Sequence, residues 1–130
     1  KQTENTVFAN ILREGVVVKF EATLRRPKSP IPLGYEKMDG NFLDIFGLSA
    51  EDLLQEKLVA FRSRKLIRDI YDVYHLSRIA EKGKISKEVF GLLRGLPQPA
   101  DEKNLKAIVF SGAVPGYAQM LQEINRRLLR

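Results

Sequence analysis

The stretch EKLVAFRSRKLIRDIYDVYHL, residues 56–76, combines an apolar stripe of helical spacing with a dense charged face. The apolar stripe begins just before this stretch with Leu54 and continues with Leu58 and Phe61. Past a predicted break near Ser63 it consists of Ile67, Ile70, Tyr71 and Tyr74. The charged face consists of Lys57, Arg62, Arg64, Lys65, Arg68, Asp69 and Asp72. Two interpretations are open: a phosphate-handling surface of an enzyme, or a solvated basic helix pair that packs well.

Helical signals continue on both sides of this stretch. Ser49 and Asp52 have the spacing at which side chains cap the first turn, which predicts a helix from about Ala50. Further helical patterns begin near Ser86, Asp101 and Pro115. The sequence therefore predicts a C-terminal bundle of about five helices.

Extended structure is predicted before the helices. Apolar and polar residues alternate over Val16–Leu24, which is typical of a strand with one polar face. Asp39 and Gly40 predict a hairpin with a tight turn, in which both of these residues have a positive φ angle. Together with the bundle, these signals predict an α+β fold in which a small partial sheet packs against helices.

Two segments beside these strands receive other predictions. Residues 3–15 predict a short helix, with Thr3 or Asn5 as its cap and Gly15 at its end. Residues 25–34 contain three prolines and a glycine, which predicts a loop.

Composition limits the class of protein. A chain of 130 residues with 44% hydrophobic content is long enough for one compact domain, with a strand-rich part at 1–48 and a helical part at 49–130. No apolar run approaches the roughly 18 residues that cross a bilayer, and there is no cysteine, so we expect a cytoplasmic protein without disulfides. Because the first residue is Lys1 and not Met, we expect a fragment of a longer protein. The net charge of +6 favours anionic partners such as nucleotides or nucleic acid.

Several charged residues are candidates for chemistry. Lys19 and Glu21 lie two apart on the predicted strand, so they share a face; the carboxylate can bind a metal or accept a proton, or the two can form a solvent-facing ion pair. On an unbroken helix, Lys57, Arg64 and Arg68 form a row of cations that suits a triphosphate or a nucleic-acid backbone.

The aspartates of the same stretch have several possible partners. Asp69 and Asp72 can hold a metal, organise Lys57 and Arg64, or pair with Lys65 and Arg68. His75, the only histidine, is expected to be partly buried and hydrogen-bonded. No phosphate-cradling glycine loop, zinc spacing or Ser/His/Asp set is present in the sequence.

The runs SAEDLLQEKLVAFRSR (49–64) and RDIYDVYHL (68–76), with VVVKFEATL (16–24) before them, resemble the latter half of the AbiEii/AbiGii-type nucleotidyltransferase toxins, a branch of the polymerase-beta-like nucleotidyltransferases. By this resemblance Glu21 is the third catalytic carboxylate and a metal ligand, with Lys19 beside it. The resemblance further implies that Lys57, together with Arg64, binds nucleotide phosphates. Arg68, Asp69 and Asp72 complete the wall of the active site.

The resemblance implies a magnesium-dependent transfer of a nucleoside monophosphate from an NTP to an acceptor such as tRNA or another RNA, with a cognate antitoxin as a further partner. The family's glycine-serine turn and metal-holding Asp-x-Asp pair are absent from these 130 residues. We therefore expect the isolated chain to be inactive and to hold neither Mg²⁺ nor NTP tightly. The alternative is a non-catalytic basic module that binds RNA or another protein.

Overall fold

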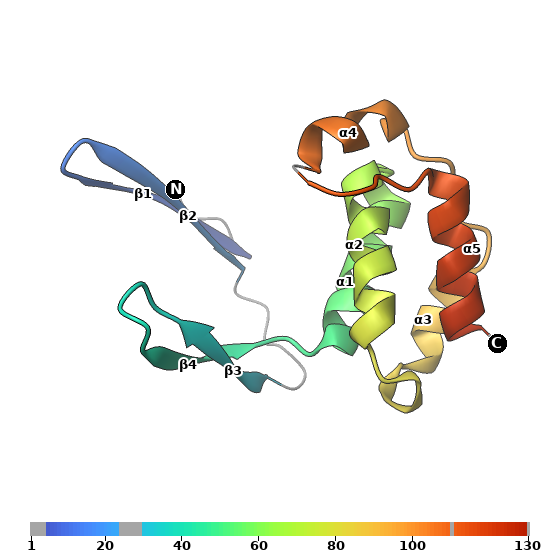
Figure 1. Ribbon diagram of the computed structural model, residues 1–130, viewed down its shortest axis with the longest axis horizontal. Helices are drawn as coiled ribbons and strands as arrows, with labels where there is room; N and C mark the ends of the chain where they lie inside the picture. The colour runs from blue at the N-terminus through green and yellow to red at the C-terminus, as the bar shows by residue number, and fades with distance from the viewer. Residues whose placement is uncertain (1–4, 24–29, 110, 130) are drawn as a thin grey trace.

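The computed structural model describes residues 5–23, 30–109 and 111–129, and it has two antiparallel hairpins followed by a helical bundle (Figure 1). The strands lie within residues 6–47 and the helices within residues 50–128. The predicted α+β class is confirmed. The strands do not join into one partial sheet, however, because each described hairpin forms its own two-stranded sheet.

The first hairpin pairs β1 (Thr6–Arg13) with β2 (Val16–Thr23), from Thr6 opposite Thr23 to Arg13 opposite Val16. The predicted strand at Val16 is confirmed as far as Thr23. The helix predicted before it is wrong, because residues 6–13, TVFANILR, pair with β2 along their whole length. The proposed Thr3 cap and Leu24 lie outside the described residues.

The turn of this hairpin explains the wrong helix prediction. Glu14 and Gly15 have φ angles of 52° and 81°, the two positive values that a two-residue hairpin turn of type I′ requires. Gly15 therefore reverses a strand, where we expected it to end a helix.

The second hairpin pairs β3 (Ile31–Glu36) with β4 (Phe42–Gly47), as the sequence predicted near Asp39. Of the two residues expected to have a positive φ in this turn, Gly40 has one (78°) and Asp39 does not. The Asp39 side chain instead accepts a hydrogen bond from the backbone N–H of Asn41 at 3.0 Å. The predicted loop at 25–34 is wrong from Ile31 onward, and residues 24–29 lie outside the described part. Pro32 is tolerated because a two-stranded sheet has only edge strands.

The charged stretch forms a helical hairpin. Ser49 Oγ accepts a hydrogen bond from the N–H of Asp52 at 3.1 Å, so helix α1 (Ala50–Arg64) begins as predicted. The chain reverses at Lys65, whose left-handed φ of 55° ends α1, and helix α2 (Ile67–Ile79) follows. The N-terminus of α2 is capped from a distance, since Asp101 Oδ1 accepts the N–H of Ile67 at 2.6 Å.

Three further helices complete the described bundle: α3 (Lys87–Leu93), α4 (Leu105–Ile108) and α5 (Tyr117–Leu128). Short 3₁₀ turns at Lys82–Lys84 and Glu102–Asn104 precede α3 and α4. α3 packs against α1, and α5 packs against α2. With α1 and α2, the described part thus has the predicted number of α-helices.

The hydrophobic core lies within the bundle. Its buried side chains are Leu54, Leu58, Phe61, Ile67, Ile70, Val73, Ile85, Val89, Leu93, Leu105, Tyr117, Met120, Ile124 and Leu128. Burying one such side chain stabilises the fold by about 1.5–3 kcal/mol. Figure 1 shows the two hairpins extending away from these helices, and strand residues such as Leu12 and Phe46 keep 70% and 78% of their surface exposed.

Among the described residues, every helix is too short or too polar to cross a lipid bilayer.

Candidate functional site

A buried carboxylate on α2 holds an arginine at the end of α1. Asp69 has no exposed surface, and it accepts hydrogen bonds from Arg64 Nε at 2.7 Å and Arg64 Nη2 at 2.6 Å. These hydrogen bonds raise the pKa of Arg64 above its ordinary value. Because 45% of the Arg64 side chain is exposed, its remaining N–H groups can reach a ligand while Asp69 fixes the guanidinium plane.

A second ion pair joins the same two helices. Lys57 Nζ lies 2.6 Å from Asp72 Oδ2, and both side chains are partly exposed. The pairing of Lys57 with Asp72 and of Arg64 with Asp69 shows that α2 runs back along α1. Of the alternatives open from the sequence, the structure selects the one in which the two aspartates organise Lys57 and Arg64.

Arg68 does not extend a row of cations on a continuous helix. That expectation is wrong because α1 ends at Arg64 and Lys65 reverses the chain direction before Arg68. Arg68 is exposed near the start of α2. The helical group therefore consists of two cations and two carboxylates, whose formal charges cancel.

The strand residues lie apart from this helical group. Lys19 and Glu21 are exposed on β2, where their cross-strand neighbours are Asn10 and Phe8. Figure 1 shows β2 well separated from α1 and α2, so the described chain does not bring Glu21 next to Lys57 or Asp69. The roles of these residues in catalysis stay predictions.

A magnesium site does not fit the described residues by themselves. Within 5–23, 30–109 and 111–129, no three His, Cys, Asp or Glu side chains gather where they could hold a metal ion. Asp69 and Asp72 already accept from Arg64 and Lys57, and Glu21 stands on a different element.

His75 is exposed, and the expected burial is wrong. Its ring makes edge contacts with Tyr71 and Tyr74, at centroid distances of 4.5 and 5.1 Å. The three aromatic side chains sit on α2 at offsets of three and four residues, which places them on one side of the helix.

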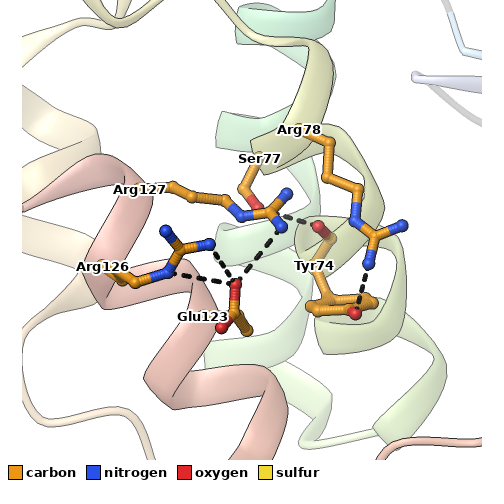
Figure 2. Close-up of polar contacts among 6 residues, drawn as sticks. All are labelled: Tyr74, Ser77, Arg78, Glu123, Arg126 and Arg127. Atoms are coloured by element: carbon orange, nitrogen blue, oxygen red, sulfur yellow. Dashed lines mark hydrogen bonds and ion pairs between the residues drawn. The ribbon is translucent and has the colours of Figure 1, made fainter.

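A polar cluster lies between α2 and α5, and none of its residues was a candidate from the sequence (Figure 2). Glu123 accepts hydrogen bonds from Arg126 Nη2 at 2.7 Å and from Arg127 Nη2 at 3.3 Å. On α2, the Arg78 guanidinium lies over the Tyr74 ring, 4.6 Å from its centroid, and donates to the Tyr74 hydroxyl. The one signal in the sequence was the arginine-rich end of α5, because Tyr74 and Arg78, which line the same groove as Glu123, are more than forty residues away in sequence.

Comparison with known families gives one match. The family described as "Nucleotidyl transferase AbiEii toxin, Type IV TA system" matches residues 6–115, from the start of β1 to the residues just before α5. No curated protein and no solved structure matches the chain.

Proposed function

Because this chain belongs to the AbiEii family of nucleotidyl transferase toxins of type IV toxin–antitoxin systems, we propose that it serves the transfer of a nucleoside monophosphate from an NTP to an acceptor such as tRNA. The match over residues 6–115 is the observation that carries the proposal. It spans both the strand with Glu21 and the helical hairpin with Arg64 and Asp69.

In this proposal the helical hairpin binds the polyphosphate of the NTP. Arg64 offers a guanidinium whose plane the buried Asp69 fixes, which reduces the entropy lost when it meets a phosphate. Lys57 supplies a second positive charge and Asp72 positions it, and Arg68 adds an exposed cation near the start of α2. Asp69 keeps its two hydrogen bonds to Arg64, and phosphate oxygens accept from the remaining N–H groups of the guanidinium.

Glu21 is proposed as the general base or third acidic group, with Lys19 beside it on the same strand face. Magnesium, when bound, neutralises polyphosphate charge, but these 130 residues lack the Asp-x-Asp pair of the family pattern. We accordingly expect that the 130 residues alone transfer no nucleotide. A cognate antitoxin is the proposed protein partner, in line with the toxin–antitoxin family.

The test uses the full-length protein and labelled NTPs. Glu21→Gln should abolish incorporation into RNA and leave RNA binding unchanged, because the amide removes a proton acceptor and keeps the shape. The matched control is Glu36→Gln, which changes another exposed strand carboxylate and should keep full incorporation. Undiminished incorporation by the Glu21 variant removes this residue from the proposed role.

A second candidate function, a non-catalytic RNA-binding module, is favoured by the lack of a metal-holding carboxylate cluster in the described residues together with the net charge of +6. In that case Lys57→Glu should weaken RNA binding and reduce its salt dependence in a protein that shows no incorporation. Incorporation by the wild-type full-length protein decides against this candidate.

A further inference from the structure

We propose that the groove between α2 and α5 binds single-stranded nucleic acid, and, resting on the proposed function, that it holds the acceptor strand. The groove has a volume of about 380 Å³. Its lining residues are Tyr74, Arg78, Pro115, Gln119, Gln122 and Glu123. It is separate from the Lys57–Asp72 and Arg64–Asp69 pairs, whose residues do not line it.

The first support is a set of three aromatic side chains, of which Tyr74 lines the groove and Tyr71 and His75 lie beside Tyr74, outside the lining. Tyr71, Tyr74 and His75 form a connected set of rings, with the exposed His75 ring against both tyrosines. Exposed aromatic rings are the groups on which unpaired bases stack, whatever the base. Tyr71 and Tyr74 are partly buried against the hydrophobic core, and Arg78 lies over the Tyr74 ring. The exposed His75 ring is therefore the aromatic surface that is open to a base.

The second support is an excess of guanidinium groups. Arg126 and Arg127 donate to a single carboxylate, Glu123, which lines the groove together with Arg78 (Figure 2). These four side chains carry a net charge of two positive units. The hydrogen bonds from Arg126 and Arg127 lower the pKa of Glu123, so the carboxylate stays charged and holds both arginines in place. Each guanidinium has five N–H groups, so N–H groups remain for phosphate oxygens.

The third support is a pair of amide side chains in the groove lining. Gln119 and Gln122 line the groove and present amides, which can donate to and accept from base edges. Rings for bases, cations for phosphates and amides for base edges together match a nucleotide chain. An acidic peptide would use the arginines but would leave the aromatic rings without a function.

The experiment measures binding of fluorescein-labelled RNA and DNA oligonucleotides of the same sequence, roughly twelve nucleotides long, to the full-length protein without NTP. The double variant Arg78→Gln/Arg126→Gln should weaken binding at least about tenfold. It should also lower the slope of log K against log salt by about 1.4, or roughly 0.7 for each lost phosphate contact. The matched control, Lys103→Gln/Lys106→Gln, removes the same charge from exposed residues outside the groove and should keep the slope.

A second variant tests stacking independently of charge. His75→Ala should weaken binding by about tenfold at unchanged salt slope, because a stacking contact is lost and no phosphate contact is. The exposed position of His75 allows the change without loss of core packing, and circular dichroism checks the fold of each variant. When the groove variants lose binding and the control does not, binding of RNA alone shows that the groove takes RNA. Equal binding of RNA and DNA shows that it takes either strand.

Three outcomes would overturn the proposal: no oligonucleotide binding by the wild-type protein, equal losses in the groove and control variants, or groove variants that bind oligonucleotides normally but lose an acidic protein partner. The proposed transfer fails separately. If the wild-type protein incorporates no nucleotide while the groove variants still lose oligonucleotide binding, the groove stands and the transfer does not.

Discussion

Asp69 is a carboxylate with no exposed surface, and within the described part of the chain the charge that pairs with it is the half-exposed guanidinium of Arg64. Removing one partner of a buried ion pair costs far more folding free energy than breaking an ion pair on the surface. The residue therefore links stability to the proposed site: the same contact that holds the helical hairpin together also orients the cation proposed to meet phosphate.

Arg64→Ala should destabilise the protein by about 3 kcal/mol, because it leaves the Asp69 carboxylate buried without its partner. Urea unfolding followed by circular dichroism measures the change. Arg68→Ala, at an exposed position, is the control and should cost less than about 0.5 kcal/mol. Equal losses in the two variants would show that the buried pair has no special weight.

Glu51 gives a prediction about pH. Its Oε1 accepts a hydrogen bond from the backbone N–H of Glu81 at 2.6 Å, and this hydrogen bond lowers the pKa of Glu51 below its ordinary value. Since the folded-state pKa is the lower one, the stabilisation is present above the unfolded-state pKa and is lost as the pH falls through the folded-state value.

Glu51→Gln should therefore reduce stability by about 1 kcal/mol at pH 7, and this difference should vanish in strong acid. Urea midpoints across the acid range measure it. Glu56→Gln, at an exposed position on the same helix, is the control and should follow the wild-type curve. A difference that persists unchanged at low pH contradicts the assignment to the ionised carboxylate.

At the scale of elements, the reversal at Lys65 decides how the charges of residues 56–76 are arranged. The periodicity of the apolar residues predicted both helices, and the N-cap at Ser49 predicted where the first begins. The position of the break was less readable, since no glycine or proline marks it. Asp101 also helps to set it by capping α2 across a gap of 34 residues, which no local pattern contains.

Lys65→Gly should stabilise the protein by about 0.5 kcal/mol, because glycine takes the left-handed conformation without a Cβ clash while losing more backbone entropy on folding. Lys65→Val should instead destabilise it by more than about 1 kcal/mol, since a branched Cβ makes the same conformation worse. Thermal unfolding compares the two variants at this one position. A stabilising valine would be incompatible with the observed backbone.

At the scale of the whole molecule, the core and the hairpins differ in how they are stabilised. The buried side chains of the core come from residues 54–128, while β1 to β4 expose large apolar residues such as Phe42 and Val16. A two-stranded hairpin is marginal in water without a packed face. The helices and the strands should therefore open with different free energies.

Hydrogen exchange of the chain should show the slowest amides in α1, α2 and α5, and fast exchange in β1 to β4. Leu58→Ala, which removes a fully buried side chain at a cost of about 3 kcal/mol, should speed exchange in the helices and leave the hairpins unchanged. Mass spectrometry of the exchanging peptides makes the comparison. Slow exchange in the hairpins that Leu58→Ala abolishes would show that strands and helices form one cooperative unit.

The sequence by itself determined the α+β class, the strand from Val16, the hairpin near Asp39 and the helices from Ser49 onward, because periodicity, capping and turn residues act over a few neighbouring positions. The first strand was misread as a helix because its identity depends on pairing with β2, which a single-segment pattern does not contain. Only the tertiary structure decided that Asp69 is buried against Arg64, that Asp72 pairs with Lys57, and that Arg78 of α2 and Glu123 of α5 line one groove. These are contacts between chain segments, and their geometry follows from how the helices pack.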